Sequence, residues 1–142
     1  MKKIIFLVIA CILVSLTGNS IIQAQSNDDL LNMIDSNKFD QTKKLIESMK
    51  PEQKEETVVR YLTGLFKLNG EEAIQIYENL LQDNSNGQIR ERVLWRMGQY
   101  YYLKGLYRQA GQFLNYLVQN FPQSKYAERA RKEIEIIEPI IK

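Results

Sequence analysis

The sequence predicts an all-α protein, and three observations support this fold class. Beyond residue 26, apolar residues recur at three- and four-residue spacing, which is the period of an α-helix. No useful length of this part alternates β-branched with polar residues, as a half-buried strand would. Prolines, which interrupt helices, occur only at Pro51, Pro122 and Pro139. Helices joined by short connections should lie antiparallel to their neighbours, so we expect a stack of helical hairpins.

The first part of this region predicts three helices. The first is short and ends near Asn37, and the second spans residues 39–49. Pro51 suits the first turn of the third helix, where its missing N–H costs nothing, and this helix stops near residues 69–70. The apolar faces of the three helices carry Leu30, Leu31, Ile34, Leu45, Ile46, Met49, Val58, Val59, Leu62, Leu65 and Phe66.

Four more helices are predicted in the rest of the chain. Glu71 and Glu72 suit the start of the fourth, because carboxylates complement the dipole at a helix N-terminus. This helix carries Tyr77 and ends in the turn-rich residues 83–87. The remaining helices are expected at residues 88–103, 107–120 and 125–137.

The N-terminus has the pattern of a secretory signal peptide. Lys2 and Lys3 precede an apolar run over residues 4–16. A positive start and an apolar run of about 7–15 residues are typical of such signals, whereas a membrane span needs about 20 apolar residues. We expect cleavage after Ala24. The predicted organisation is therefore a signal peptide at residues 1–24 and one helical domain at residues 25–142, so we expect the protein to be exported.

Cys11, the only cysteine, permits two interpretations. Residues 8–11 loosely resemble a lipoprotein cleavage box, which would make Cys11 a lipid anchor. The apolar run continues after Cys11, however, whereas a lipoprotein box normally closes it. We therefore expect Cys11 to leave with the signal, and the lipid-anchored form remains the alternative.

The composition argues against catalysis. The chain contains no histidine, which excludes Ser–His–Asp and Cys–His catalysis and imidazole metal ligands. It shows no glycine-rich phosphate loop, serine elbow or acidic metal loop. We therefore expect no enzymatic activity, no cofactor and no metal site.

The charges are unevenly distributed. Without Lys2 and Lys3 the chain carries 17 basic and 17 acidic residues. Residues 26–83 contain 7 basic and 12 acidic residues, whereas residues 84–142 contain 10 basic and 5 acidic ones. Such a charge dipole bears on association with partners, although solvated helix surface is the simpler interpretation. Nucleic acid is not an expected partner of an exported protein.

Residues 91–124 contain the clearest repeat pattern. Gly98 and Ala110 are small, so two helices can approach closely where they cross. Gly105 and Tyr107 lie at the turn between these helices, and Pro122 ends the second one. The other positions of the pattern are Leu94, Met97, Tyr101, Leu114 and Leu117.

These residues resemble the tetratricopeptide repeat (TPR), whose period is about 34 residues. Two weaker copies precede it, one around Leu68, Ala73 and Tyr77 and one around Phe39 and Thr42. The resemblance implies an α-α superhelix of about three TPR-like hairpins followed by a C-terminal capping helix. The helix registers before residue 86 are open, because the spacings depart from the period.

Residues 121–130 add a finer resemblance. The sequence from Phe121 through Tyr126 and Ala127 to Ala130 looks like the aromatic-Pro-x-Ser-x-Tyr-Ala-x-x-Ala junction of envelope repeat proteins. These include outer-membrane-assembly lipoproteins and the coordinator of the Tol–Pal system. The resemblance implies an adaptor of the periplasm or cell envelope.

In the TPR family the inner helix of each hairpin lines a concave groove that binds a partner. This implies a partner-binding site at Arg92, Trp95, Arg96, Gln99 and Tyr102. Aromatic residues and arginines often dominate interface energetics, and arginine can grip carboxylates. The expected ligand is therefore an acidic peptide or protein segment.

Structural interpretations compete for several of these residues. Trp95 could instead pack against the preceding hairpin, and the two arginines could be solvated surface. Tyr101 is expected in the core and Tyr100 between helices. The charges of the last helix, Glu128, Arg129, Arg131, Lys132, Glu133 and Glu135, are expected to face solvent.

The leading hypothesis is an envelope adaptor that binds proteins through its groove. The alternative is a structural component that associates with itself through the charge dipole and the isoleucines at 134, 136, 137, 140 and 141. The sequence does not identify the partner or the oligomeric state.

Overall fold

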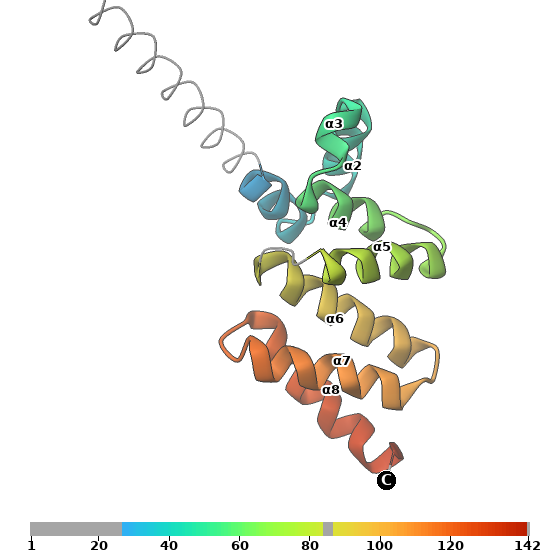
Figure 1. The fold of residues 1–142 in the computed structure, drawn as a ribbon. Coiled ribbons are helices and arrows are strands. Elements are labelled where there is room, and N and C mark those ends of the chain that lie inside the picture. The colour runs from blue at the N-terminus through green and yellow to red at the C-terminus, as the bar shows by residue number, and fades with distance from the viewer. Residues whose placement is uncertain (1–26, 84–86, 142) are drawn as a thin grey trace, which may run out of the picture. The chain divides into compact units, whose positions relative to one another are not determined.

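The computed structural model describes residues 27–83 and 87–141, and every regular element in these two ranges is an α-helix. The predicted all-α class is thereby confirmed for the described part of the chain. The predicted signal peptide, its cleavage after Ala24 and Cys11 lie outside the described residues. The described residues belong to two units, residues 27–49 in the first and residues 50–83 and 87–141 in the second. Figure 1 shows the order of the helices along the chain.

Two helices form the described part of the first unit. The first covers residues 27–35, and α2 spans Phe39–Ser48. The turn between them contains Asn37 with a positive φ of 60°, a conformation that asparagine tolerates better than most residues. The buried side chains are Leu30, Leu31, Ile34, Thr42 and Ile46. The expected apolar face of α2 is wrong in part, because Leu45 is 44% exposed and Met49 is only half-buried, while Thr42 is buried in addition.

The third predicted helix is two helices in the structure, which corrects the expectation of one continuous helix. Helix α3 covers only Pro51–Lys54, and α4 spans Thr57–Leu65. Glu56 between them is extended, with a ψ of 142°. No side chain of α3 is buried, whereas the buried face of α4 begins at Val58. Without an apolar face to pack, helix propensity alone does not sustain a continuous helix here.

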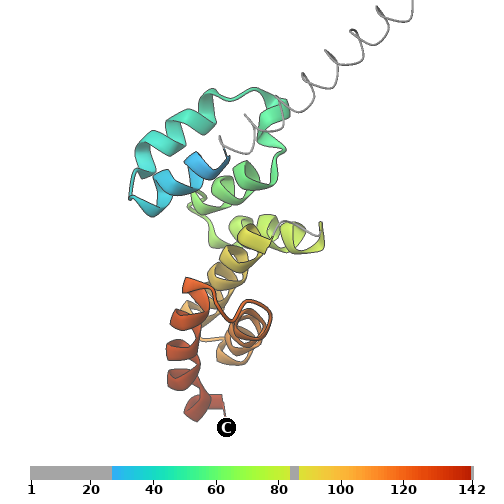
Figure 2. The ribbon, with the colours of Figure 1, turned by 90° about the vertical axis from the view of Figure 1, so that its left-hand side faces the viewer.

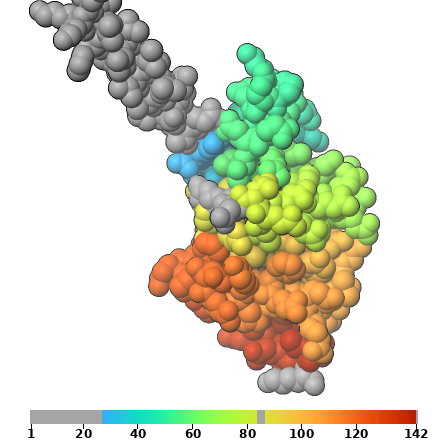
Figure 3. All heavy atoms as spheres, in the orientation of Figure 1, coloured from blue at the N-terminus to red at the C-terminus, as the bar shows by residue number. Residues whose placement is uncertain are grey.

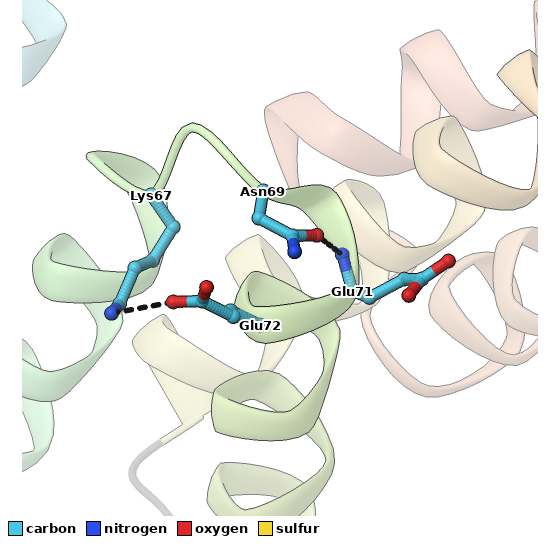
Figure 4. A network of polar contacts seen from close by, with 4 residues as sticks. All are labelled: Lys67, Asn69, Glu71 and Glu72. Carbon is cyan, nitrogen blue, oxygen red and sulfur yellow. Dashed lines mark hydrogen bonds and ion pairs between the residues drawn. The ribbon is translucent and has the colours of Figure 1, made fainter.

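Helix α5 spans Gly70–Gln82 and begins with a well-formed cap. The side chain of Asn69 accepts a hydrogen bond of 2.9 Å from the backbone N–H of Glu71, as an N-cap residue does. Lys67 reaches across the turn and pairs with Glu72 at 2.8 Å. Figure 4 shows both contacts holding the turn between α4 and α5. Both glutamates lie in the first turn of α5, as the dipole argument predicts.

The last three helices form the best-packed part of the second unit. Helix α6 spans Gly87–Leu103, α7 spans Tyr107–Asn120 and α8 spans Lys125–Ile141. Helix α7 packs against both α6 and α8, which themselves are in contact (Figure 2). The start and end of α6 and α7 agree with the prediction to within one residue. Helix α8 continues past the predicted end at residue 137 and contains Pro139 in its last turn.

Side chains fill the spaces between these ribbons in the space-filling view (Figure 3). One hydrophobic cluster joins α6, α7 and α8 and has Leu94, Trp95, Ala110, Leu114, Leu117, Tyr126, Ala130 and Ile137 as its buried members. Leu94, Ala110, Leu114 and Leu117, four positions of the pattern at residues 91–124, therefore lie in the core.

Two glycines mark the points where paired helices come closest. A Cβ at Gly64 of α4 would lie 2.6 Å from the Tyr77 ring of α5. A Cβ at Gly98 of α6 would lie 2.5 Å from Cδ2 of Leu114 in α7. The expected close approach at Gly98 is thus present, and Gly64 has the same role one hairpin earlier.

None of the helices in the described ranges combines the length and the apolar character needed to cross a membrane.

Candidate functional site

Helix α6 carries all five residues predicted to bind a partner, but it does not expose them equally. Arg92 and Trp95 are buried, with relative exposures of 4% and 6%. The two residues lie three positions apart and both face α8, where Tyr126 begins the buried surface.

The contacts of Arg92 and Trp95 join α6 to α8. The Nη1 atom of Arg92 donates a hydrogen bond of 2.7 Å to the hydroxyl of Tyr126. The guanidinium carbon lies 5.5 Å from the centroid of the same ring, which is within cation–π range. The Trp95 ring lies 6.4 Å from that of Tyr126. Trp95 therefore packs against α8.

The other three predicted residues remain partly accessible. Arg96, Gln99 and Tyr102 are half-buried and lie at three-residue intervals, so they share one side of α6. Nη1 of Arg96 donates to Oε1 of Gln99 at 3.3 Å. Tyr102 packs edge-to-face on Tyr107, with the ring centroids 5.5 Å apart. We call Arg96, Gln99 and Tyr102 the α6 row.

The neighbouring tyrosines have structural roles. Tyr101 stacks on Phe113 with an interplanar angle of 4° and a centroid distance of 5.4 Å. Its pKa is raised, chiefly by burial and secondarily by the charge of Glu78. A Cβ at Gly70, the first residue of α5, would lie 2.8 Å from the Tyr100 ring. Tyr100 therefore packs against the start of α5.

The α6 row lies close to a buried tyrosine of α5. Burial raises the pKa of Tyr77, the neighbouring Tyr61 raises it further, and the positive charge of Arg96 acts in the opposite sense. The guanidinium of Arg96 is therefore near enough to interact electrostatically with α5. Its recorded hydrogen bond is to the amide of Gln99, which a stronger acceptor such as a carboxylate can replace.

Glu133 departs from the expected solvent-facing charge pattern of the last helix. Its Oε2 atom is buried and has no hydrogen-bond partner among the described residues. Burial raises the pKa of this carboxyl group above its ordinary value. Glu133 lies three residues after Ala130 and four before Ile137, both of which are fully buried, so it belongs to the packed side of α8.

A pocket that the sequence did not indicate lies between α5, α6 and α7. Its volume is about 350 Å³. The residues lining it are Leu81, Arg90, Leu94, Gln112, Phe113 and Tyr116. They come from three helices and from three separate stretches of sequence, so no local motif could have marked them.

Comparisons with known proteins give no match. No protein-family profile, no curated protein and no solved structure is significantly similar to this chain. Within residues 27–83 and 87–141, no group of histidine, cysteine, aspartate and glutamate residues is arranged to hold a metal ion. The candidate sites therefore rest on the geometry described above.

Proposed function

We propose that this chain is a TPR-type protein-binding module that holds a protein or peptide segment on the α6 row. The function is binding, without catalysis and without a cofactor. The signal-like N-terminus and the junction at residues 121–130 favour a place in the periplasm or cell envelope, where the module acts as an adaptor.

The observation that carries the proposal is a recurrence at the spacing of the repeat. Gly64 and Gly98 are 34 positions apart, and at each of them one helix of a hairpin closely approaches its partner. Arg92 and Tyr126, also 34 apart, join helices α6 and α8. This spacing equals the period of about 34 residues that defines the tetratricopeptide repeat. The equal spacing supports helices α4, α6 and α8 as equivalent members of successive units.

The first unit supports the same interpretation. Asn37 and Gly105, the residues with positive φ in the described chain, are 68 positions apart, which is two periods. Thr42 and Ala110, also 68 apart, are both fully buried small residues just after these turns. The weak copy around Thr42 therefore has the same local geometry as the clear copy.

Charge favours an acidic ligand. Residues 87–124 contain five arginines and lysines but only one acidic residue, Glu91. Arg96 in the α6 row can exchange the neutral amide of Gln99 for a carboxylate, because a carboxylate carries the opposite charge and can accept two parallel N–H bonds from the guanidinium. Tyr102 beside it offers a broad contact surface with few rotatable bonds.

The test is a cross-linked capture from cell envelopes with tagged protein comprising residues 25–142. The variant Arg96→Ala/Tyr102→Ala removes the two largest side chains of the α6 row. Arg108→Ala, an exposed arginine of α7, is the matched control for lost charge. We expect one partner that wild type and control capture and the double variant loses, while the circular dichroism of all three proteins is the same. Equal capture by all three proteins would exclude the α6 row as the binding surface.

Self-association is the second candidate function. Ile136 and Ile140 lie four residues apart on α8 and expose 56% and 55% of their surface. Side chains four positions apart share one side of a helix, so they form an apolar edge. If this edge joins copies of the chain, Ile136→Ser/Ile140→Ser should shift sedimentation at low salt from oligomer to monomer. A wild-type protein that is monomeric under these conditions would exclude this alternative.

A further inference from the structure

The pocket between α5, α6 and α7 combines an apolar interior with one cation. Leu81, Leu94 and Phe113 supply apolar walls from three different helices. Tyr116 extends the wall and is itself 43% exposed, so the pocket opens at the surface. A volume of about 350 Å³ lies at the small end of the roughly 300–1,000 Å³ that ligand pockets span. The pocket therefore has the size for one or two side chains of a partner.

Arg90 supplies the cation and is held in place by the pocket itself. Its Nη1 atom donates a hydrogen bond of 3.1 Å to the backbone carbonyl of Leu81. A guanidinium has five N–H donors in a rigid fork, so donors remain for a ligand after this bond is made. No acidic residue lines the pocket, and the structure records no ion pair for Arg90 within the described residues.

We propose that this pocket binds an apolar side chain of a partner protein, with an adjacent carboxylate of the same segment paired to Arg90. The apolar walls gain from excluding water around a phenylalanine or leucine side chain. The fixed guanidinium gains a charge-assisted hydrogen bond without first ordering its own side chain. Charge selects the occupant, because Arg90 is the one charged residue among the described residues that line the pocket. A segment with an aromatic or branched aliphatic residue next to aspartate or glutamate meets both requirements.

This site is separate from the α6 row. Arg90 and Leu94 are four residues apart on one side of α6, whereas Gln99 is turned to the opposite side by the 3.6-residue period. A module with both sites could hold two segments of one partner, or two partners. The proposal does not depend on binding at the α6 row, and each site can fail without the other.

The test uses a pair of acetylated, amidated hexapeptides. One contains phenylalanine followed by aspartate within glycines, and the other has asparagine in place of aspartate. Binding to tagged protein of residues 25–142 is followed by nuclear magnetic resonance titration, which also locates the affected residues. The variants are Arg90→Gln, which removes the charge, and Gln112→Glu, which adds an opposing charge at an exposed lining residue. Arg108→Gln is the control, because it makes the same change on α7 outside the pocket.

The aspartate peptide should perturb the signals of Phe113 and Tyr116 and should bind about tenfold more tightly than the asparagine peptide, because only the aspartate offers the Arg90 guanidinium an ionised acceptor. Arg90→Gln should remove this preference and weaken the aspartate peptide about tenfold. Gln112→Glu should weaken the same peptide, and Arg108→Gln should leave both affinities unchanged.

Three results would overturn the proposal. The first is no perturbation of the pocket at millimolar peptide. The second is perturbation confined to the α6 row around Gln99. The third is that wild type binds the aspartate and asparagine peptides equally tightly, as Arg90→Gln does. Because Arg96→Ala/Tyr102→Ala leaves this pocket intact, loss of capture by that variant together with failure of the peptide test would separate the two sites.

Discussion

Gly64 and Gly98 occupy the crossing points of two hairpins, and each faces a buried side chain of the paired helix. A Cβ at Gly64 would approach Cε1 of Tyr77 to 2.6 Å, and this ring is only 4% exposed. A Cβ at Gly98 would approach Cγ and Cδ2 of Leu114, which is fully buried. Because both neighbours are buried, the side chains around them restrict how far they can move.

We expect Gly64→Ala and Gly98→Ala each to destabilise the protein by about 1–2 kcal/mol. Overpacking a tight contact costs about 1–3 kcal/mol, which exceeds the gain of up to about 1 kcal/mol from replacing a helical glycine with alanine. Gly111→Ala is the control, because its Cβ would meet Ile137 at an ordinary 3.4 Å and should therefore be neutral or stabilising. Urea unfolding followed by circular dichroism measures all three. Stabilisation by all three substitutions would contradict this account of the crossings.

Glu133 should make the stability depend on pH in a direction opposite to that of most carboxylates. Its pKa is raised by burial in the folded state, so the folded protein binds the proton more tightly than the unfolded chain does. The contribution of Glu133 to the free energy of unfolding is therefore fully present below the pKa that this carboxyl has in the unfolded chain. The contribution is lost as the pH rises through the higher pKa that it has in the folded protein. Glu133→Gln should remove this loss and raise the free energy of unfolding near pH 7 relative to wild type.

The matched control is Glu135→Gln, which changes an exposed carboxylate two residues further along α8. Urea unfolding at several pH values from 4 to 8 should separate Glu133→Gln from both wild type and control. Parallel curves for all three proteins would show that the Glu133 carboxyl is solvated when the protein is folded.

Among the elements, α8 shows how a helix with strong alternating charge can still be part of the core. Its exposed side carries Lys132 and Glu128, which pair at 3.2 Å with little shielding from solvent. Such exposed pairs contribute at most about 1 kcal/mol. The other side buries Ala130 and Ile137 against the hairpin of α6 and α7. Packing of this apolar side, more than the charges, holds α8 in place.

We expect Ile137→Ala to destabilise the protein by about 2–5 kcal/mol, the range for truncating a fully buried isoleucine. Ile136→Ala, one position away and 56% exposed, should change the free energy of unfolding by less than about 0.5 kcal/mol. Thermal and urea unfolding of both variants give the comparison. A similar loss in both would place the two isoleucines in equivalent environments and contradict the packing described here.

At the scale of the whole molecule, the two compact units differ in how much structure each can sustain. The described part of the first unit is a pair of short helices in residues 27–49. Chains below about 40 residues rarely bury enough surface to fold without disulfides or metals. The second unit, Lys50–Lys142, contains the hydrophobic cluster and six of the helices described.

We therefore expect a fragment of residues 50–142 to remain helical and to unfold cooperatively on heating. A peptide of residues 27–49 should be mostly unfolded, since isolated helices shorter than about 12–15 residues are marginal in water. Far-ultraviolet circular dichroism of the two fragments, with the chain of residues 25–142 as control, measures both. Loss of the cooperative transition in the longer fragment would show that its core needs the first unit.

The sequence alone predicted the all-α class and the bounds of α6 and α7 to within one residue. These depend on local signals, namely the apolar period and the turn residues around Gly105 and Pro122. The single long helix after Pro51 was wrong, because the break at Glu56 follows from the absence of buried side chains in α3, and burial depends on what packs nearby.

The candidate site, like the fold, could be predicted from the sequence only in part. The repeat motif predicted that α6 carries the partner-facing positions, but periodicity cannot tell whether another helix covers a side chain. Tyr126, 34 residues along the chain, buries Arg92 and Trp95 and leaves Arg96, Gln99 and Tyr102 accessible. The pocket at Arg90 and the burial of Glu133 likewise arise where separate helices meet. The sequence by itself determined the all-α class and most helix bounds, because these depend on neighbours along the chain. Only the tertiary structure decided where the helix after Pro51 breaks and which side chains stay exposed, because both depend on what packs against each helix.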